Sequence, residues 1–333
     1  MTVSLGIIGT GGFGSYFGRQ LKAVDDADIV SIADVSDENR TRAGEELGVP
    51  DANRYVDYEL MLADAPLDGV VISTPHTLHY EMITAAMDEG LHVMCEKPLT
   101  TDLEQARDLV ERADASDTLL MVGYQRHLSP AFLLAKERLE AIEPTFITAE
   151  ITQNWLTDTA ETWRQDPALS GGGQLYDTGS HLVDAVLWTT GLTPQSVSAS
   201  MVFVDEAERV DVQAVLNVEF ENGGVASLSV SGDAPRVSEH IRVWGEGGGV
   251  RVDGTDWDDR EVSFVDPDGT EVYPSEEGIE DRNRAEAFVD AIVHDEEPPA
   301  TPRDALAVTA LTEAAYESAK TGETVEIDLG GLV

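Results

Sequence analysis

At 333 residues the chain exceeds the usual size of one hydrophobic core, and its 42% hydrophobic residues and 14 prolines are typical of a globular protein. Asp and Glu number 64 against 21 Lys and Arg, a formal net charge of −43, which argues against nucleic acid and anionic membranes as partners. The acids are scattered along the chain, which suggests a surface adapted to concentrated salt. Unfolding that is insensitive to salt removal would contradict that hypothesis.

Cys95 is the only cysteine, so we expect neither a disulfide framework nor a thiolate metal cluster. No cationic leader precedes an apolar stretch at the start, and no apolar run has the length of a membrane span. These features predict a cytoplasmic protein.

The first predicted elements are a strand, a glycine-rich turn and a helix. The apolar run VSLGII at residues 3–8 predicts a strand buried on both faces, and residues 9–14 spell GTGGFG before a helical pattern. This is the GxGxxG spacing of dinucleotide-binding folds. Gly9 suits the tight turn, Gly11 the close approach of a pyrophosphate, and Gly14 the packing of the helix on the strand.

The second predicted strand, Ile29–Ala33, ends in Asp34, twenty residues beyond Gly14. Its carboxylate would accept hydrogen bonds from the adenosine ribose and repel a 2′-phosphate, so NAD is favoured over NADP. The alternative is a glycine turn that binds nothing. The combination of strand, turn, helix and acid disfavours that alternative.

Helices and strands then alternate, which predicts a parallel, doubly wound α/β sheet over residues 1–123. The further helices are predicted at 37–47, 58–63, 79–89 and 102–115, and the further strands at 69–73, 91–95 and 118–122. Ser73, Thr74 and Pro75 end one of these strands at the edge of the sheet where ligands bind.

Lys97, one of four lysines, lies in the triplet Glu96-Lys97-Pro98 directly after the strand 91–95. A charge at that edge faces the ligand site of an open parallel sheet. Taken alone, a lysine that pairs with Glu96 and caps the strand explains the residue equally well. His76 and His79 are interpreted as structural, although His79 is also a candidate contact. The candidate cofactor contacts are Gly9, Gly11, Gly12, Phe13, Gly14, Asp34, Ser73, Thr74, Pro75, His79, Glu96, Lys97 and Gln125.

Beyond a predicted helix at 131–142 the hydrophobic period changes to two, which predicts an α+β domain over residues 124–333. Asn222-Gly223-Gly224 and Gly247–Gly249 indicate turns of an antiparallel sheet. The uncovered face of that sheet predicts a homodimer or homotetramer. Its strands are predicted at 146–153, 197–204, 212–220, 225–230 and 240–244, and helices at 284–293 and 302–320 close the domain.

The stretch 170–191 carries the chemistry of this second half. Three glycines precede a predicted helix in which Asp177, His181 and Asp184 fall at i, i+4 and i+7, on one face. An acid one turn from a histidine can prepare it as a general base. The alternatives are a polar stripe without function and, weakest, a metal site, so no metal is expected. Upstream, Trp163 and Arg164 offer an aromatic wall and a hydrogen-bonding fork to a polyol.

Three marks in this order and spacing resemble the Gfo/Idh/MocA oxidoreductase family over nearly the whole chain: the Gly9–Gly14 loop, the Glu96-Lys97-Pro98 triplet, and the segment Gly171–Asp184. The resemblance implies that Lys97, Asp177 and His181 line a site beside the nicotinamide. It also implies a cis peptide bond before Pro98.

The implied function is NAD-dependent hydride transfer from a sugar or cyclitol hydroxyl carbon. His181 takes the hydroxyl proton, Lys97 stabilises the alkoxide, and Asp177 fixes substrate and imidazole. The candidate substrate-binding residues are Lys97, Arg126, Trp163, Arg164, Asp177 and His181. Two rivals remain: a glycosidase or lyase that recycles bound NAD, and a non-catalytic regulator that senses the cofactor.

Overall fold

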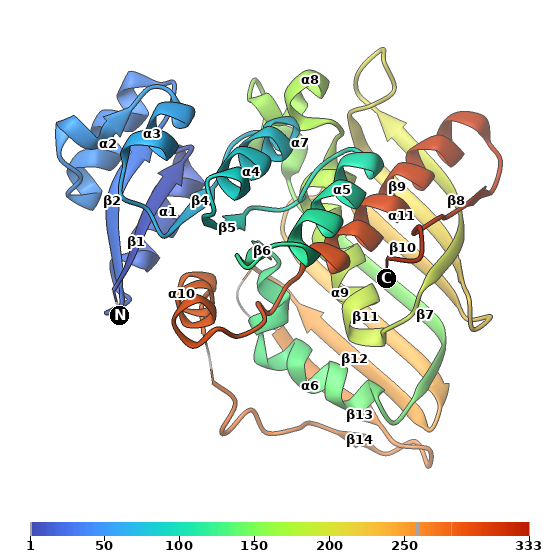
Figure 1. Ribbon diagram of the computed structural model, residues 1–333. Helices are drawn as coiled ribbons and strands as arrows, with labels where there is room; N and C mark the ends of the chain where they lie inside the picture. Colours follow the sequence, from blue (N-terminus) through green and yellow to red (C-terminus); the bar gives the residue numbers. More distant parts are fainter. Residues whose placement is uncertain (1, 258–259, 281, 333) are drawn as a thin grey trace. The chain divides into compact units, whose positions relative to one another are not determined.

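The computed structural model describes residues 2–257, 260–280 and 282–332 (Figure 1). The chain divides into two compact units, each built from segments that are distant in sequence. The first unit comprises Met1–Thr100, Glu104–Gln125 and Arg282–Pro302, and the second comprises Thr101–Leu103, Arg126–Asp281 and Arg303–Val333.

The first unit is built on a parallel sheet in the order β3-β2-β1-β4-β5-β6, with six strands in the described part of the chain. This is the strand order of dinucleotide-binding sheets, so the predicted doubly wound fold is confirmed. Its central strands are almost entirely buried, which is typical of a parallel sheet with helices on both faces. The strands are β1 (Val3–Ile8), β2 (Ala27–Ala33), β3 (Arg54–Tyr55), β4 (Gly69–Ile72), β5 (His92–Cys95) and β6 (Leu120–Val122).

Capping residues mark the two ends of α2, one of the helices of this unit. In α2, the Ser36 side chain accepts a hydrogen bond from the Asn39 amide, and Gly48 ends the helix in the left-handed conformation. The elements are α1 (Gly12–Leu21), α2 (Asp37–Leu47), η1 (Asp51–Asn53), α3 (Tyr58–Asp64), η2 (His76–Leu78), α4 (His79–Asp88), α5 (Leu103–Asp114) and α10 (Arg284–His294).

The helix α10 differs from expectation, because it belongs to the first unit and does not close the second. It contacts α1 and β1, and its apolar residues, among them Phe288 and Val289, are buried. A single boundary near residue 123 therefore describes the chain incompletely. The amphipathic pattern predicted the helix but carried no information about which core receives it.

The second unit is built on a nine-stranded sheet in the order β14-β13-β12-β11-β7-β10-β9-β8-β15, again among the described residues. Among the strands that the structure describes, only β7 and β10 of this sheet pair in parallel, so the predicted, mainly antiparallel sheet is confirmed. The strands are β7 (Glu143–Thr152), β8 (Pro194–Phe203), β9 (Asp211–Phe220), β10 (Val225–Ser231), β11 (Ser238–Glu246), β12 (Gly248–Gly254), β13 (Arg260–Val265), β14 (Glu271–Val272) and β15 (Val325–Glu326).

The strands β12, β13 and β14 were missed by the sequence analysis. They are rich in glycine and charge, so alternation alone did not mark them. The two predicted turns are confirmed: Gly223 joins β9 to β10 at φ +82°, and Gly247 and Gly248 join β11 to β12 at φ +102° and +128°.

Helices α6 and α9 pack on this sheet. The opposite face carries exposed apolar side chains, including Phe146, Val215 and Val225. The homo-oligomer that we inferred from this uncovered face stays a prediction. The helical elements are η3 (Gln125–Leu128), α6 (Pro130–Leu139), α7 (Trp155–Asp158), η4 (Trp163–Gln165), α8 (Pro167–Ser170), η5 (Leu175–Gly179), α9 (Ser180–Thr190) and α11 (Pro302–Thr321).

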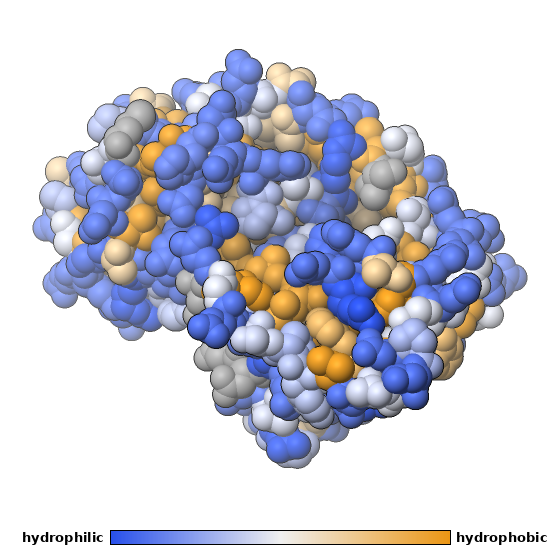
Figure 2. Space-filling model, turned by 90° about the horizontal axis from the view of Figure 1, so that it is seen from below, coloured by the Kyte–Doolittle hydropathy of each residue, from blue (hydrophilic) through white to orange (hydrophobic). Residues whose placement is uncertain are grey.

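The face of the molecule shown in Figure 2 is covered mostly by hydrophilic residues, as the composition requires. Within the three described stretches of chain, no helix combines the length and the apolar character needed to cross a membrane.

A buried ion network ties together distant segments of the second unit. Glu239 of β11 is fully buried, and it accepts hydrogen bonds from Nε of Arg126 at 2.9 Å and from Nε of Arg260 at 2.6 Å. Both guanidinium groups are also almost fully buried. Removing the shared carboxylate would take the counterion from the buried Arg126 and one ion pair from Arg260.

We therefore expect Glu239→Ala to lower the free energy of unfolding by about 3–5 kcal/mol. The matched control is Glu271→Ala, which breaks a more exposed pair with Arg251 and should cost about 0–1 kcal/mol. Denaturant titrations of both variants at one salt concentration measure the difference. Equal losses would contradict the stabilising role of the buried network.

Candidate functional site

The glycine loop has the geometry that the fingerprint predicts. Gly9 has φ +86°, and a Cβ atom there would lie 2.5 Å from the carbonyl oxygen of Ser73, while one at Gly14 would overlap the carbonyl of Gly9. At Gly11 and Gly12, by contrast, a Cβ atom would meet nothing within 4 Å. The loop is thus tight where it turns and open where a ligand would approach.

The N-terminus of α1 is suited to an anion. Gly11 is its N-cap, no side chain caps it, and its first turn, which the structure describes in full, holds no acidic residue. The unpaired amides and the helix dipole at such a terminus favour a phosphate. The residues present therefore fit the pyrophosphate of a dinucleotide.

Asp34 lies at the end of β2, beside this loop. Its carboxylate accepts hydrogen bonds from the amide of Thr10 at 2.7 Å and from the amide of Ser36 at 2.8 Å. Two guanidinium groups are close by: Arg40 donates to the carbonyl of Asp34 at 2.7 Å, and Arg42 donates to that of Thr10 at 3.0 Å. An acid and two cations therefore frame the expected ribose position.

His79 is held in the interior of the first unit. Its ring is fully buried, with Nδ1 2.8 Å from the carbonyl oxygen of Pro98 and Nε2 3.0 Å from that of Thr74. Burial lowers the pKa of this imidazole. The side chain joins the turn after β4 to the turn after β5, which supports the structural interpretation and not a direct cofactor contact.

The triplet that follows β5 lies at the carboxyl edge of the sheet, where the Glu96 amide donates to the carbonyl of Ile72 at 3.0 Å. The Lys97–Pro98 peptide bond is cis, as the resemblance implied. Glu96 is 8% exposed, and its Oε1 accepts a hydrogen bond from Nη1 of Arg284 at 2.6 Å. A pair between Lys97 and Glu96 was the alternative to a site lysine, and the structure shows that Glu96 pairs with an arginine from α10.

In the second unit the structure brings Asp177, Arg164 and Trp163 together. Oδ2 of Asp177 accepts hydrogen bonds from Nε of Arg164 at 3.0 Å and from Nε1 of the buried Trp155 at 2.8 Å. The Arg164 guanidinium lies 4.5 Å from the centre of the Trp163 ring. The carboxylate is therefore fixed in place by two donors.

The predicted continuous α-helix through this stretch is wrong. Residues 175–179 form a π-helix, η5, and α9 begins only at Ser180. Single π-turns of this kind occur frequently at functional sites, because the extra residue per turn re-aims the side chains around it. Asp177 lies in the π-turn and His181 at the start of α9.

Asp184 does not extend that pair. Its Oδ1 lies 2.9 Å from Nε2 of His127, whose ring stacks on Trp188 with a centroid separation of 4.0 Å. Burial raises the pKa of the Asp184 carboxyl. His181 is 6% exposed, and its ring centre lies 6.3 Å from that of Trp257. Asp184 is therefore bound to His127, which the one-face spacing did not predict.

Arg126 and Gln125 lie in η3. The Arg126 guanidinium is bound to Glu239 and is 3% exposed, so its charge is used inside the second unit. This contact favours a structural role over the expected role in substrate binding.

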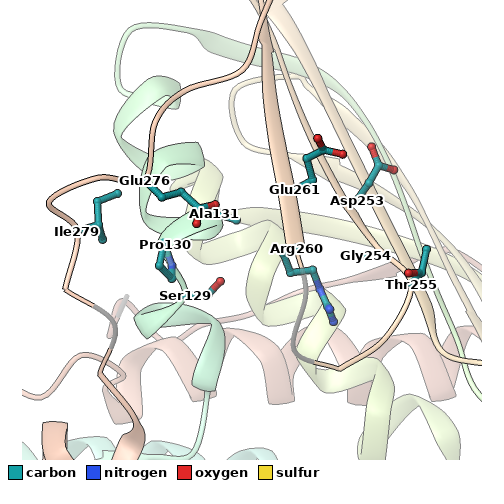
Figure 3. A pocket seen from close by; sticks show the side chains of 10 residues that line it. All are labelled: Ser129, Pro130, Ala131, Asp253, Gly254, Thr255, Arg260, Glu261, Glu276 and Ile279. Carbon is teal, nitrogen blue, oxygen red and sulfur yellow. The ribbon is translucent and has the colours of Figure 1, made fainter.

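A pocket of about 570 Å³ lies in the second unit (Figure 3). Pro130 and Ala131 of α6 line one side, and Arg260 and Glu261 of β13 line the other. None of the candidate site residues lines it. Among the residues that the structure covers, no group of three or more His, Cys, Asp or Glu side chains is arranged to hold a metal ion.

Comparison with protein-family models matches both halves of the chain. Residues 3–124 match the oxidoreductase family with an NAD-binding Rossmann fold, GFO_IDH_MocA, and residues 140–251 match the GFO/IDH/MocA C-terminal domain. The chain belongs to the Gfo/Idh/MocA family.

Two curated relatives illustrate this similarity. The chain is 30% identical to the D-xylose 1-dehydrogenase (NADP(+)) 2 of Haloferax volcanii, over 97% of this chain and 99% of the relative. It is 29% identical to the myo-inositol 2-dehydrogenase of Thermotoga maritima, over 75% of each. Among solved structures, an NAD-binding protein from Listeria innocua superposes with a TM-score of 0.80 at 29% identity, over 100% of this chain and 98% of that one.

Sequence reasoning missed the group that anchors the π-turn in this Gfo/Idh/MocA protein. The buried carboxylate of Asp211, the first residue of β9, accepts hydrogen bonds from the amide of Gly173 at 3.2 Å and that of Leu175 at 3.0 Å, and from the hydroxyl of Tyr316. A Cβ atom at Gly173 would overlap the Asp211 backbone, so only glycine fits there. The Gly173 carbonyl in turn accepts from the amide of Asp177 at 3.0 Å. The only signal in the sequence was an acid at the start of a strand of alternating polar and apolar residues.

Burial raises the pKa of Asp211 to about 6, so the folded protein keeps this proton at pH values where the unfolded chain has lost it. The contribution of Asp211 to stability is therefore fully present below about pH 4 and is lost as the pH rises to about 6. Asp211→Asn does not titrate. We expect the free energy of unfolding of the wild type, relative to this variant, to fall by roughly 3 kcal/mol at most over that interval. Denaturant titrations from pH 4 to 7 test this, and a pH-independent difference would contradict it.

Proposed function

We propose that this protein is an NAD-dependent dehydrogenase that oxidises a hydroxyl-bearing carbon of a sugar or cyclitol. The observation that carries the proposal is the open N-terminus of α1 at Gly11 and Gly12, on a sheet whose carboxyl edge also bears Lys97. The names of the xylose and inositol dehydrogenases to which the chain is similar support the substrate class.

In this proposal the first unit binds the dinucleotide and the second supplies the substrate contacts. NAD, when bound, supplies the acceptor for the hydride that leaves the carbon. His181 takes the hydroxyl proton as general base, and Lys97 stabilises the developing alkoxide by its charge. Asp177, fixed by Trp155 and Arg164, orients the substrate and the imidazole.

We expect His181→Ala to retain NADH binding and to lose about 100-fold to 10,000-fold in turnover, because a general base typically contributes that much. Absorbance of NADH at high salt measures turnover with a panel of free aldoses, inositols and sugar acids. The control is His294→Ala, which removes an exposed histidine in α10 and should leave turnover unchanged. Full activity in His181→Ala would refute its role as the base.

The preference for NAD rests on Asp34, whose charge would repel a 2′-phosphate. Arg40 and Arg42 lie near enough to act in the opposite sense. We expect the wild type to have a higher kcat/KM with NAD than with NADP, and Asp34→Ala to shift the ratio about tenfold or more toward NADP. Glu38→Ala, which removes an exposed acid from α2, is the matched control. A wild type that prefers NADP would overturn this assignment. It would indicate that Arg40 and Arg42 bind the 2′-phosphate of the ribose.

A further inference from the structure

Arg284 is an unusual first residue for a helix. A cation near a helix N-terminus is disfavoured by the helix dipole. The terminus of α10 is already capped, because the Asn283 side chain accepts from the amides of Ala285 and Glu286, and the Glu286 side chain accepts from the Asn283 amide. The capping of α10 therefore does not explain an arginine at this position. The contacts of Arg284 with other parts of the first unit explain it.

The Arg284 guanidinium joins the ends of two neighbouring strands. Nη1 donates to Oε1 of Glu96, directly after β5, at 2.6 Å, and to the carbonyl oxygen of Gly123, directly after β6, at 3.0 Å. Arg284 is 7% exposed, so this ion pair is shielded from solvent. A buried pair of this kind restricts its partners to one geometry.

The same guanidinium also contacts the glycine loop. Its central carbon lies 4.9 Å from the centre of the Phe13 ring and 5.8 Å from that of Phe17, both in α1. Contacts of a guanidinium with aromatic rings at these distances are attractive. Phe13 belongs to the GTGGFG fingerprint, so one side chain holds the fingerprint and the triplet together.

The Glu96 carboxylate is confined on its other side as well. A Cβ atom at Gly123 would lie 2.9 Å from Oε1 of Glu96, so the absence of a side chain at Gly123 makes room for the carboxylate. Glu96 therefore fits between a glycine and the arginine, and the main chain leaves it directly into Lys97.

We propose that Arg284 is a positioning residue of the dinucleotide site, which acts through Glu96 and Phe13 and not by touching the reacting atoms. It holds the glycine loop and the Glu96-Lys97-Pro98 triplet at a fixed spacing, so that the loop is pre-organised for the cofactor. The inference rests on the proposed function of the first unit. It also gives a reason for the return of residues 282–302 to this unit.

The test measures NADH binding to the full-length protein at high salt by the change in NADH fluorescence, without any substrate. Arg284→Met keeps the length of the side chain but removes its charge, and we expect the Kd for NADH to rise between about tenfold and 100-fold. Glu96→Gln keeps the shape of the carboxylate and should raise the Kd less. The control is Arg282→Ala, which breaks a partly exposed pair with Asp290 and should leave the Kd unchanged.

A double variant separates positioning from general weakening of the fold. If Arg284 acts through Glu96, the losses in Arg284→Met and Glu96→Gln overlap, so the double variant binds NADH more tightly than the product of the two single losses. Each Kd is measured below the unfolding temperature of every variant, as determined by circular dichroism. If Arg284→Met does not fold, Arg284→Lys decides, because lysine keeps the charge but loses the flat contact with Phe13.

Three results would overturn an assignment, and they are distinguishable. A wild type that binds no NADH refutes the proposed function itself. A wild type that binds NADH, together with a folded Arg284→Met variant of unchanged Kd, refutes only the role of Arg284, and an unchanged Kd in Arg284→Lys refutes the route through Phe13. Losses that simply multiply in the double variant refute the route through Glu96.

Discussion

The first unit depends on the close backbone crossing between β1 and α1. Gly9 and Gly14 allow the strand, the turn and the helix to approach without a Cβ atom between them, and the carbonyl of Ser73 after β4 closes against the same turn. This crossing leaves the amides at Gly11 and Gly12 accessible. Gly9 and Gly14 make the close packing, and Gly11 and Gly12 between them stay open. The same six residues therefore pack the turn and leave a helix N-terminus that suits an anion.

In the second unit, Asp177 and His181 lie on a short, irregular segment, the π-turn and the start of α9. The π-turn that carries Asp177 is anchored from behind by Asp211 and Tyr316, through the amides of Gly173 and Leu175. In front, the indole of Trp155 and the Arg164 guanidinium fix the Asp177 carboxylate itself. Irregular backbone persists only where such contacts over-determine it.

The chain has only 21 Lys and Arg among 333 residues, yet some of these side chains are buried. Arg284 pairs with Glu96 beside the triplet, and Arg126 pairs with the fully buried Glu239. Surface ion pairs contribute little and are screened by salt, whereas buried pairs are screened far less. The two buried pairs therefore depend less on ionic strength than the exposed pairs of the same chain do.

The sequence by itself determined the two sheets, the glycine loop and the triplet, because strand periodicity, glycine spacing and strand-end position are local patterns. The tertiary structure alone decided that Glu96 pairs with Arg284, that Asp184 pairs with His127, and that α10 joins the first unit. It also replaced the expected α-helix around Asp177 with a π-turn. These outcomes depend on which side chains meet across long separations in the chain, and that information is absent from the spacing of residues within one element.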